Sequence, residues 1–209
     1  MFPVEIMSAY IAAVLIVIFA PGPDNILAIS RGLSQGYLAA VLSSVGAGLG
    51  IMFHTLATTL GLALILQASP VAFWAVKVAG AAYLLWLGYK AITTHSLISF
   101  RQDGKAPLHR VFATGLLSNM LNPKPGLFVV AFIPQFVSID RGPVHIQILT
   151  YGVIFAVLTA LIFSLLGYFS AQLSHWLKRR PRAVVITNIG AGITFLAAGL
   201  SILALERQS

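Results

Sequence analysis

Long apolar segments make up most of this chain, and they constrain what it can fold into. A helix that crosses a bilayer needs about 20 mostly apolar residues, because hydrocarbon offers the backbone no hydrogen-bonding partner. The connections between the segments are short, so the sequence predicts one all-α membrane domain with six transmembrane helices. The six segments are Val4–Ala20, Leu38–Leu66, Val71–Ile92, Val111–Ile139, Ile146–Trp176 and Ala183–Leu205.

The composition excludes most other classes of protein. Only 9% of the 209 residues are charged, against roughly 25% in a soluble domain, which is too few to cover a soluble globule. The absence of cysteine excludes disulfides and thiol chemistry. The sequence has no Walker-type phosphate loop and no paired carboxylates or histidine cluster, so we expect neither a cofactor nor a bound metal. A cleaved signal peptide is not expected, because Glu5 is the only early charge and Pro-Gly-Pro follows the first segment.

The excess of positive charge is interpreted as a topology signal. Lys and Arg number 13 against 5 Asp and Glu, which in a soluble protein would suggest nucleic acid. Six spans place both termini on one side, and most of the cations fall in loops on the other side, so that side is predicted to be cytoplasmic and the termini to lie outside. No nucleic-acid partner is therefore expected. The cations on the predicted cytoplasmic side are Arg31, Lys90, Arg101, Lys105, Arg110, Lys178, Arg179, Arg180 and Arg182.

The basic run at residues 178–182 has two interpretations. It anchors the topology and touches anionic lipid headgroups, or it forms a specific site for a lipid or a regulator. The sequence favours the anchor.

Matching features in the two halves of the chain predict an internal repeat. Each half opens with a span broken by proline and closes with a helix that contains Gly-Ala, at 80–81 and at 190–191. An odd number of spans per half inverts the second half relative to the first, as in many secondary transporters. We therefore expect two inverted three-helix repeats, at about 1–92 and 111–207, joined by a cytoplasmic loop at about 93–110. The breaks are formed by Pro21, Gly22 and Pro23 in the first half and by Pro123 and Pro125 in the second.

Glycines four residues apart predict close helix packing. Gly32 and Gly36 form one such pair, and Gly46 and Gly50 form another. Small residues let helix backbones approach closely where apolar burial cannot drive association. The same faces also allow a homodimer.

The first break offers a candidate site. A proline break within a membrane is tolerated where it faces protein or a wet cavity, and the exposed half-helix ends carry partial charges suited to a zwitterion. Asp24 follows this break and would bind a substrate amine or exchange a proton. Alternatively, it caps the following helix at the cytoplasmic interface. Asn25 beside it can hydrogen-bond in either case.

The second break adds further candidates. Lys124 lies well inside the fourth segment and should not face lipid, so it would pair with Asp24 or bind a substrate carboxylate. Asn119 and Asn122 would line the same cavity if Lys124 faces inward. His54 in the second segment would relay protons or hydrogen-bond a neighbouring helix.

Two polar residues in other segments have less specific interpretations. Lys77 is close enough to a span end for its ammonium to reach the interface. Asn188 would join helices or line the cavity.

Three stretches resemble the LysE/RhtB family (lysine exporter / homoserine-threonine resistance) of bacterial amino-acid exporters. They are Pro21-Gly22-Pro23 with the glycines that follow it, VKVAGAAYLLWLGYKAI at 76–92, and GLLSNMLNPKPGLFVVAFIPQF at 115–136. The resemblance implies a six-span exporter of small amino acids in the bacterial inner membrane, driven by the proton gradient. The chain departs from the motif at its second proline, Pro125. The residues at motif positions are Pro21, Gly22, Pro23, Asn119, Asn122, Pro123, Lys124 and Gln135.

The main hypothesis is therefore a proton-coupled secondary exporter of amino acids or related small zwitterions. An exporter of an inorganic ion or another small metabolite is the alternative within the same class. A membrane-embedded enzyme would need a constellation of catalytic groups that the sequence does not offer. An accessory subunit of a larger complex would not require two opposed breaks with ionic residues.

Overall fold

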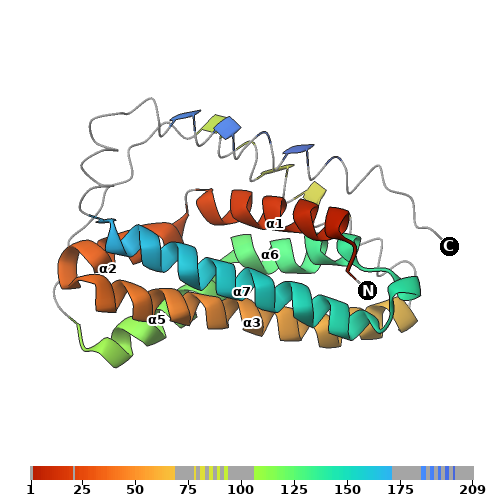
Figure 1. The fold of residues 1–209 in the computed structure, drawn as a ribbon, viewed down its shortest axis with the longest axis horizontal. Coiled ribbons are helices and arrows are strands. Elements are labelled where there is room, and N and C mark those ends of the chain that lie inside the picture. Colours follow the sequence, from red (N-terminus) through yellow and green to blue (C-terminus); the bar gives the residue numbers. More distant parts are fainter. Residues whose placement is uncertain are drawn as a thin grey trace.

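The computed structural model describes residues 2–20, 22–68 and 106–170, together with scattered helical residues between 78 and 93 and between 185 and 200. The described part is helical and contains no strand (Figure 1). The α-helices are α1 (Val4–Phe19), α2 (Pro23–Gln35), α3 (Tyr37–Ala68), α5 (Leu108–Leu121), α6 (Pro123–Phe132) and α7 (Val144–Tyr168), and the 3-10 helices are η1 (Ile133–Phe136) and η2 (Ile139–Arg141).

Several predictions lie outside the described residues. They include most of the third and sixth predicted spans, with Lys77 and Asn188, and also Pro21 and the basic run at 178–182. The inverted repeat depends on those two spans, so it stays a prediction.

Two of the described helices are long and apolar enough to cross a membrane, over Tyr37–Gly61 and Val144–Tyr168. Two bent helix pairs also qualify if each pair counts as a single span. The bend between α1 and α2 is 62°, and the bend between α5 and the α6–η1 segment is 51°. The predicted interruptions of the first and fourth spans are therefore confirmed, and the chain is a multi-pass membrane protein.

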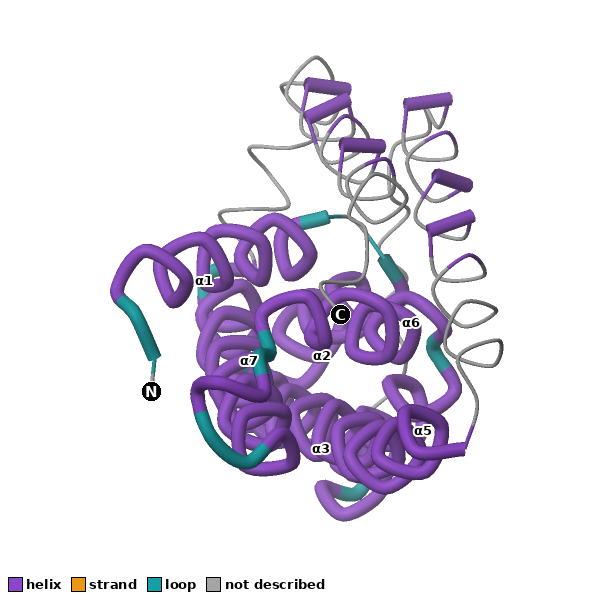
Figure 2. The backbone as a smooth tube through the Cα atoms, turned by 90° about the vertical axis from the view of Figure 1, so that its right-hand side faces the viewer, coloured by secondary structure: helices purple, strands orange, loops and turns teal. Residues whose placement is uncertain are grey.

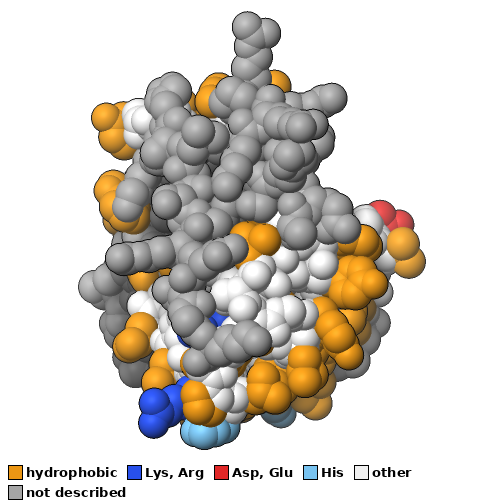
Figure 3. All heavy atoms as spheres, turned by 90° about the vertical axis from the view of Figure 1, so that its left-hand side faces the viewer, with side chains coloured by type: hydrophobic (Ala, Val, Ile, Leu, Met, Phe, Trp, Pro, Cys, Tyr) orange, Lys and Arg blue, Asp and Glu red, His pale blue; other side chains and the backbone are white. Residues whose placement is uncertain are grey.

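The outer faces of the long helices carry apolar side chains. On α3 they are at least two-fifths exposed and recur every three or four residues, as Leu49, Phe53, Leu56 and Leu60, and Val153, Val157, Leu161 and Leu165 repeat the pattern on α7. Helices that are apolar on both the buried and the exposed face are typical of membrane spans. In the end view of Figure 3, hydrophobic side chains gather along the right-hand and lower sides of the described surface, while lysine, arginine and histidine side chains show mainly at the lower edge.

Glycines allow the helices at the centre of the bundle to pack closely. α3 packs against both α5 and α7 (Figure 2). A Cβ added at Gly46 would collide with the backbone of α5, and one at Gly50 would collide with the side chain of Asn119. The packing role predicted for this pair is confirmed. Gly36 was grouped with the packing glycines, but nothing lies within 4 Å of the Cβ position there. Its φ of +87° ends α2 instead, a conformation that favours glycine.

Contacts at the two ends of the bundle show at which end each connection between helices lies. At one end, the ring of Phe2 lies 5.5 Å from that of Tyr151, near the start of α7. At the other end, the Gln35 amide donates to the Ala106 carbonyl oxygen at 2.7 Å. The N-terminal residues therefore lie at the same end as the connection between η1 and α7, as the six-span count predicts. Which end faces the cytoplasm stays a prediction.

Arg31 differs from its predicted place in a connection. It lies inside α2, is 8% exposed and donates to the Gln35 side chain at 3.1 Å. The reason is local: Pro23 starts a new helix, because proline suits a first turn in which its missing N–H has no helical acceptor.

Candidate functional site

The end of α1 exposes carbonyl groups that side chains from elsewhere satisfy. The last carbonyls of any helix lack intrahelical donors. Here the Asn25 amide donates to the Ile18 oxygen at 2.7 Å, and the Lys124 ammonium donates to the Ala20 oxygen at 2.8 Å. The negative end of the α1 dipole therefore holds a positive charge, which is the favourable arrangement.

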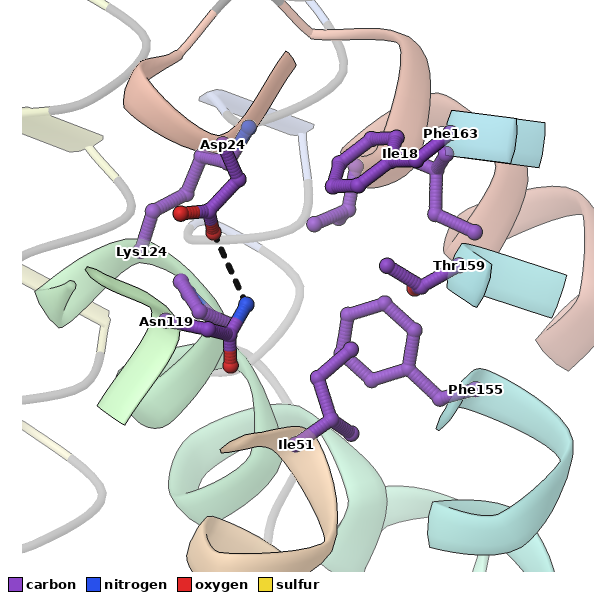
Figure 4. Close-up of a pocket in the computed structure, with 10 residues that line it drawn as sticks. Ile18, Asp24, Ile51, Asn119, Lys124, Phe155, Thr159 and Phe163 are labelled. Atoms are coloured by element: carbon purple, nitrogen blue, oxygen red, sulfur yellow. Dashed lines mark hydrogen bonds between the residues drawn. The ribbon is translucent and has the colours of Figure 1, made fainter. Parts of the chain in front are cut away.

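Asp24 is directed across the bundle. It is the second residue of α2 and is 5% exposed. The N-cap position of α2 is occupied by Gly22, and no side chain caps the helix there. The interpretation of Asp24 as an interfacial helix cap is therefore wrong. Its carboxylate accepts from Ser118 Oγ at 2.9 Å, from Asn119 Nδ2 at 2.8 Å (Figure 4) and from Asn122 Nδ2 at 2.9 Å. Three donors from the second broken span therefore hold the carboxylate oxygens in place.

The second break is bridged by a histidine from α3. Pro123 has no N–H to give to the carbonyl of Asn119, four residues earlier. That carbonyl accepts from the Asn122 N–H at 3.0 Å, and His54 Nε2 lies 3.1 Å from it. A carbonyl oxygen only accepts, so Nε2 carries the proton in this contact. Of the two interpretations of His54, the hydrogen bond to a neighbouring helix is observed, and the proton relay stays untested.

Asn122 links the charged groups through the backbone. Its Oδ1 accepts from the Lys124 N–H at 3.0 Å and caps α6, while its Nδ2 donates to Asp24. Among the described residues, no direct ion pair joins Asp24 to Lys124. The carboxylate is occupied by donors from α5 and Asn122, and the ammonium reaches the end of α1 instead.

A pocket lies between these polar groups and an apolar wall. In Figure 4, Asp24, Lys124 and Asn119 stand on one side, and side chains from α1, α3 and α7 stand on the other. The space has room for little more than a water molecule. The lining residues are Val17, Ile18, Asp24, Ile51, Asn119, Lys124, Pro125, Phe155, Thr159 and Phe163.

Buried polar atoms without a hydrogen-bond partner lie around this pocket. Asn119 Oδ1 and Thr159 Oγ1, which belong to lining residues, are buried without a hydrogen-bond partner, as is the nearby Asn25 Oδ1. Buried polar atoms are normally satisfied, so each one asks for an explanation. A small ligand with donor groups would satisfy them. Within the part of the chain that the structure describes, no group of three or more acidic or histidine side chains could hold a metal ion.

Sequence reasoning found most of the polar side of the site and missed the rest. Asp24, Asn119 and Lys124 meet at the pocket, Asn122 joins two of them, and Pro125 lines it. Ser118 was overlooked, although it adjoins Asn119 in the same motif. Thr159 was also overlooked, and no local signal distinguishes it in an apolar helix. Gln135, a motif residue, donates to Ala131 within its own segment at 3.0 Å and is not among the lining residues.

Comparison with known proteins gives consistent matches over nearly the whole chain. The sequence profile of LysE type translocators matches residues 15–205. The chain is 30% identical to an uncharacterized membrane protein, YrhP, of Bacillus subtilis, with 92% of this chain and 95% of that protein covered. It is 29% identical to the homoserine/homoserine lactone efflux protein of Salmonella typhimurium (96% and 97% covered) and 25% identical to the leucine efflux protein of an Enterobacter species (90% and 90% covered). No solved structure matches the chain.

Proposed function

Because the chain belongs to the family of LysE type translocators, we propose that it is a secondary exporter of amino acids or related small zwitterions. A translocator moves its substrate and does not convert it, so the prediction of a transporter and not an enzyme is confirmed at the level of the family. Two similar proteins are named as efflux proteins for homoserine or its lactone and for leucine, which supports amino acids as the substrate class.

The observation that carries the proposal is the placement of opposite charges without direct pairing. Asp24 and Lys124 both line the pocket, and each is held by neutral partners. The substrate ammonium would bind Asp24 and the free Oδ1 of Asn119. Its carboxylate would bind Lys124, displacing the Ala20 carbonyl oxygen from the ammonium, with the Asn122 amide nearby. A bound zwitterion would thus give each of these two buried charged groups an opposite charge, and burying them without one is energetically costly.

Transport then requires the bundle to open. The pocket has room for little more than a water molecule, so an amino acid does not fit until the helices around it separate. We propose the helix ends at the two breaks as hinges, because side chains bond to carbonyls there: Asn25 and Lys124 at the end of α1, and His54 at the end of α5.

The coupling we propose is exchange against protons. Asp24 can neutralise its charge by binding either the substrate ammonium or a proton, and the two compete for one carboxylate. Release of the amine outside would be followed by proton binding, return and proton release inside. We propose that the protein works in the bacterial inner membrane with both termini outside, alone or as a homodimer.

The test uses vesicles loaded with a panel of amino acids, with and without an imposed pH gradient. We expect export to depend on the gradient and to fall at least tenfold in Asp24→Asn and Lys124→Ala. Asp140→Asn and Arg110→Ala are matched controls, because both residues are exposed and away from the pocket. Gradient-independent export would remove the coupling, and full export by both site variants would remove the site assignment.

Export of an inorganic cation is the alternative, and it makes a different prediction. A metal cation prefers several oxygen ligands, and Asp24 is the only acidic residue among the pocket-lining residues of the described part. Metal-dependent efflux without amino-acid export would favour this alternative.

A further inference from the structure

One face of α7 forms the wall opposite the charged residues. Phe155, Thr159 and Phe163 are four residues apart, so they lie on the same side of the helix. Their exposed fractions are 2%, 2% and 3%, and all three line the pocket. Figure 4 shows them facing Asp24 and Asn119 across the space, with Ile18 and Ile51 completing the wall.

The hydroxyl of Thr159 differs from most others in the long helices. Thr55, Thr59 and Thr150 each donate to the carbonyl four residues earlier, at 2.7 to 2.9 Å. Thr159 Oγ1 is buried and has no partner, although its residue lines the pocket. Thr58 also lacks a partner, but it is not a lining residue. A buried hydroxyl without a partner carries a desolvation cost that a bound group would remove.

We propose that the Phe155–Thr159–Phe163 face is the subsite that receives the substrate's side chain, and that it selects an uncharged side chain bearing a hydroxyl. The inference rests on the proposed function, because the ammonium and carboxylate must already be held at Asp24 and Lys124. Among the described residues, the lining around Phe155, Thr159 and Phe163 contains no ionisable side chain, so a charged substrate side chain would be buried there without a partner. The aromatic rings limit its size, and Thr159 supplies the polar contact.

Threonine and valine make the most discriminating pair of probes. They have nearly the same shape, but threonine has a hydroxyl group where valine has a methyl group. One neutral hydrogen bond changes relative affinity by about tenfold. We therefore expect the purified protein in proteoliposomes to transport threonine in preference to valine. Thr159→Val should lower the ratio of threonine to valine transport by about tenfold, and Thr159→Ser, which keeps the hydroxyl, should retain the preference.

Thr150→Val is the matched control. It is the same substitution on the same helix, at an outward position whose hydroxyl bonds its own backbone, and it should leave the ratio unchanged. If Thr159→Val does not assemble, Phe163→Leu provides the second test. The wider wall should then raise transport of phenylalanine relative to threonine.

The outcomes separate this inference from the proposed function. Wild-type transport of lysine or glutamate as fast as threonine would leave amino-acid export standing and overturn the subsite. So would an equal loss of threonine and valine transport in Thr159→Val. Transport of none of the panel would overturn the proposed function and, with it, this inference.

Discussion

The ammonium of Lys124 lies 2.8 Å from the carbonyl oxygen of Ala20, a contact between residues 104 positions apart. It ties the start of α6 to the end of α1, so each broken helix stabilises the other. A group that binds Lys124 therefore competes with a structural contact, and ligand binding and the geometry of the breaks are coupled.

Gly22 leaves the space that Lys124 needs. A Cβ at Gly22 would lie 2.9 Å from Lys124 Nζ, while its φ of −169° is one that alanine adopts. Gly22→Ala should therefore fold but displace the ammonium from Ala20, and export should fall several-fold. Export measured per unit of protein in the membrane tests this.

Gly61→Ala is the control for that substitution, because nothing lies within 4 Å of the added Cβ. Replacing this helical glycine should leave export unchanged and stabilise α3 by about 0.5–1 kcal/mol. Equal export by the two variants would show that the position of Lys124 does not matter for transport.

Ser118 is the donor to Asp24 that sequence reasoning missed. Its hydroxyl donates to Asp24 Oδ1 at 2.9 Å, and a hydrogen bond to a charged group contributes about 1.5–3 kcal/mol. Ser118→Ala should reduce export by roughly tenfold or more. Thr114→Val on the same helix removes an exposed hydroxyl bonded to its own backbone and should have no effect. The same small loss in both variants would argue against a role for Ser118.

His54 is expected to act by bridging the second break. His54→Leu removes the side-chain donor to the Asn119 carbonyl and should lower stability by about 1 kcal/mol. His54→Gln, which offers an amide donor, should restore part of this stability. Export by His54→Gln should still depend on the pH gradient. Loss of that dependence with export intact would instead support the proton relay.

Gln147 holds the connection before α7. It is fully buried, its amide donates to the carbonyls of Ser138 and Gly142 at 2.8 Å each, and its oxygen accepts from the Ser138 N–H at 3.2 Å. Gln147→Leu leaves these groups unpaired and should destabilise the protein by about 2–4 kcal/mol. A melting curve in detergent tests this, with Gln135→Leu as the control because it loses one bond to its own helical segment. Identical midpoints for the two variants would contradict the expectation.

Local chemistry explains which features could be predicted from the sequence. Apolar length predicts a span, and proline predicts a break, wherever the rest of the chain lies. The α5–α6 break at Pro123 therefore appeared in both the sequence and the structure. The role of Gly36 was misassigned because its spacing fits packing and a turn equally well, and its backbone conformation decides between them.

The sequence by itself determined the class of protein, the family and the residue types at the two breaks. The glycine spacing predicted the packing face of α3, but only the tertiary structure decided which face of α7 turns inward, because α7 is apolar nearly all round and its hydrophobic pattern prefers no face. That rotation brings Thr159 into the pocket. It also decided that Asp24 bonds to residues 94 to 98 positions away while Lys124 bonds to Ala20. Such partners are set by close helix packing at positions like Gly46 and Gly115, which a linear pattern does not specify.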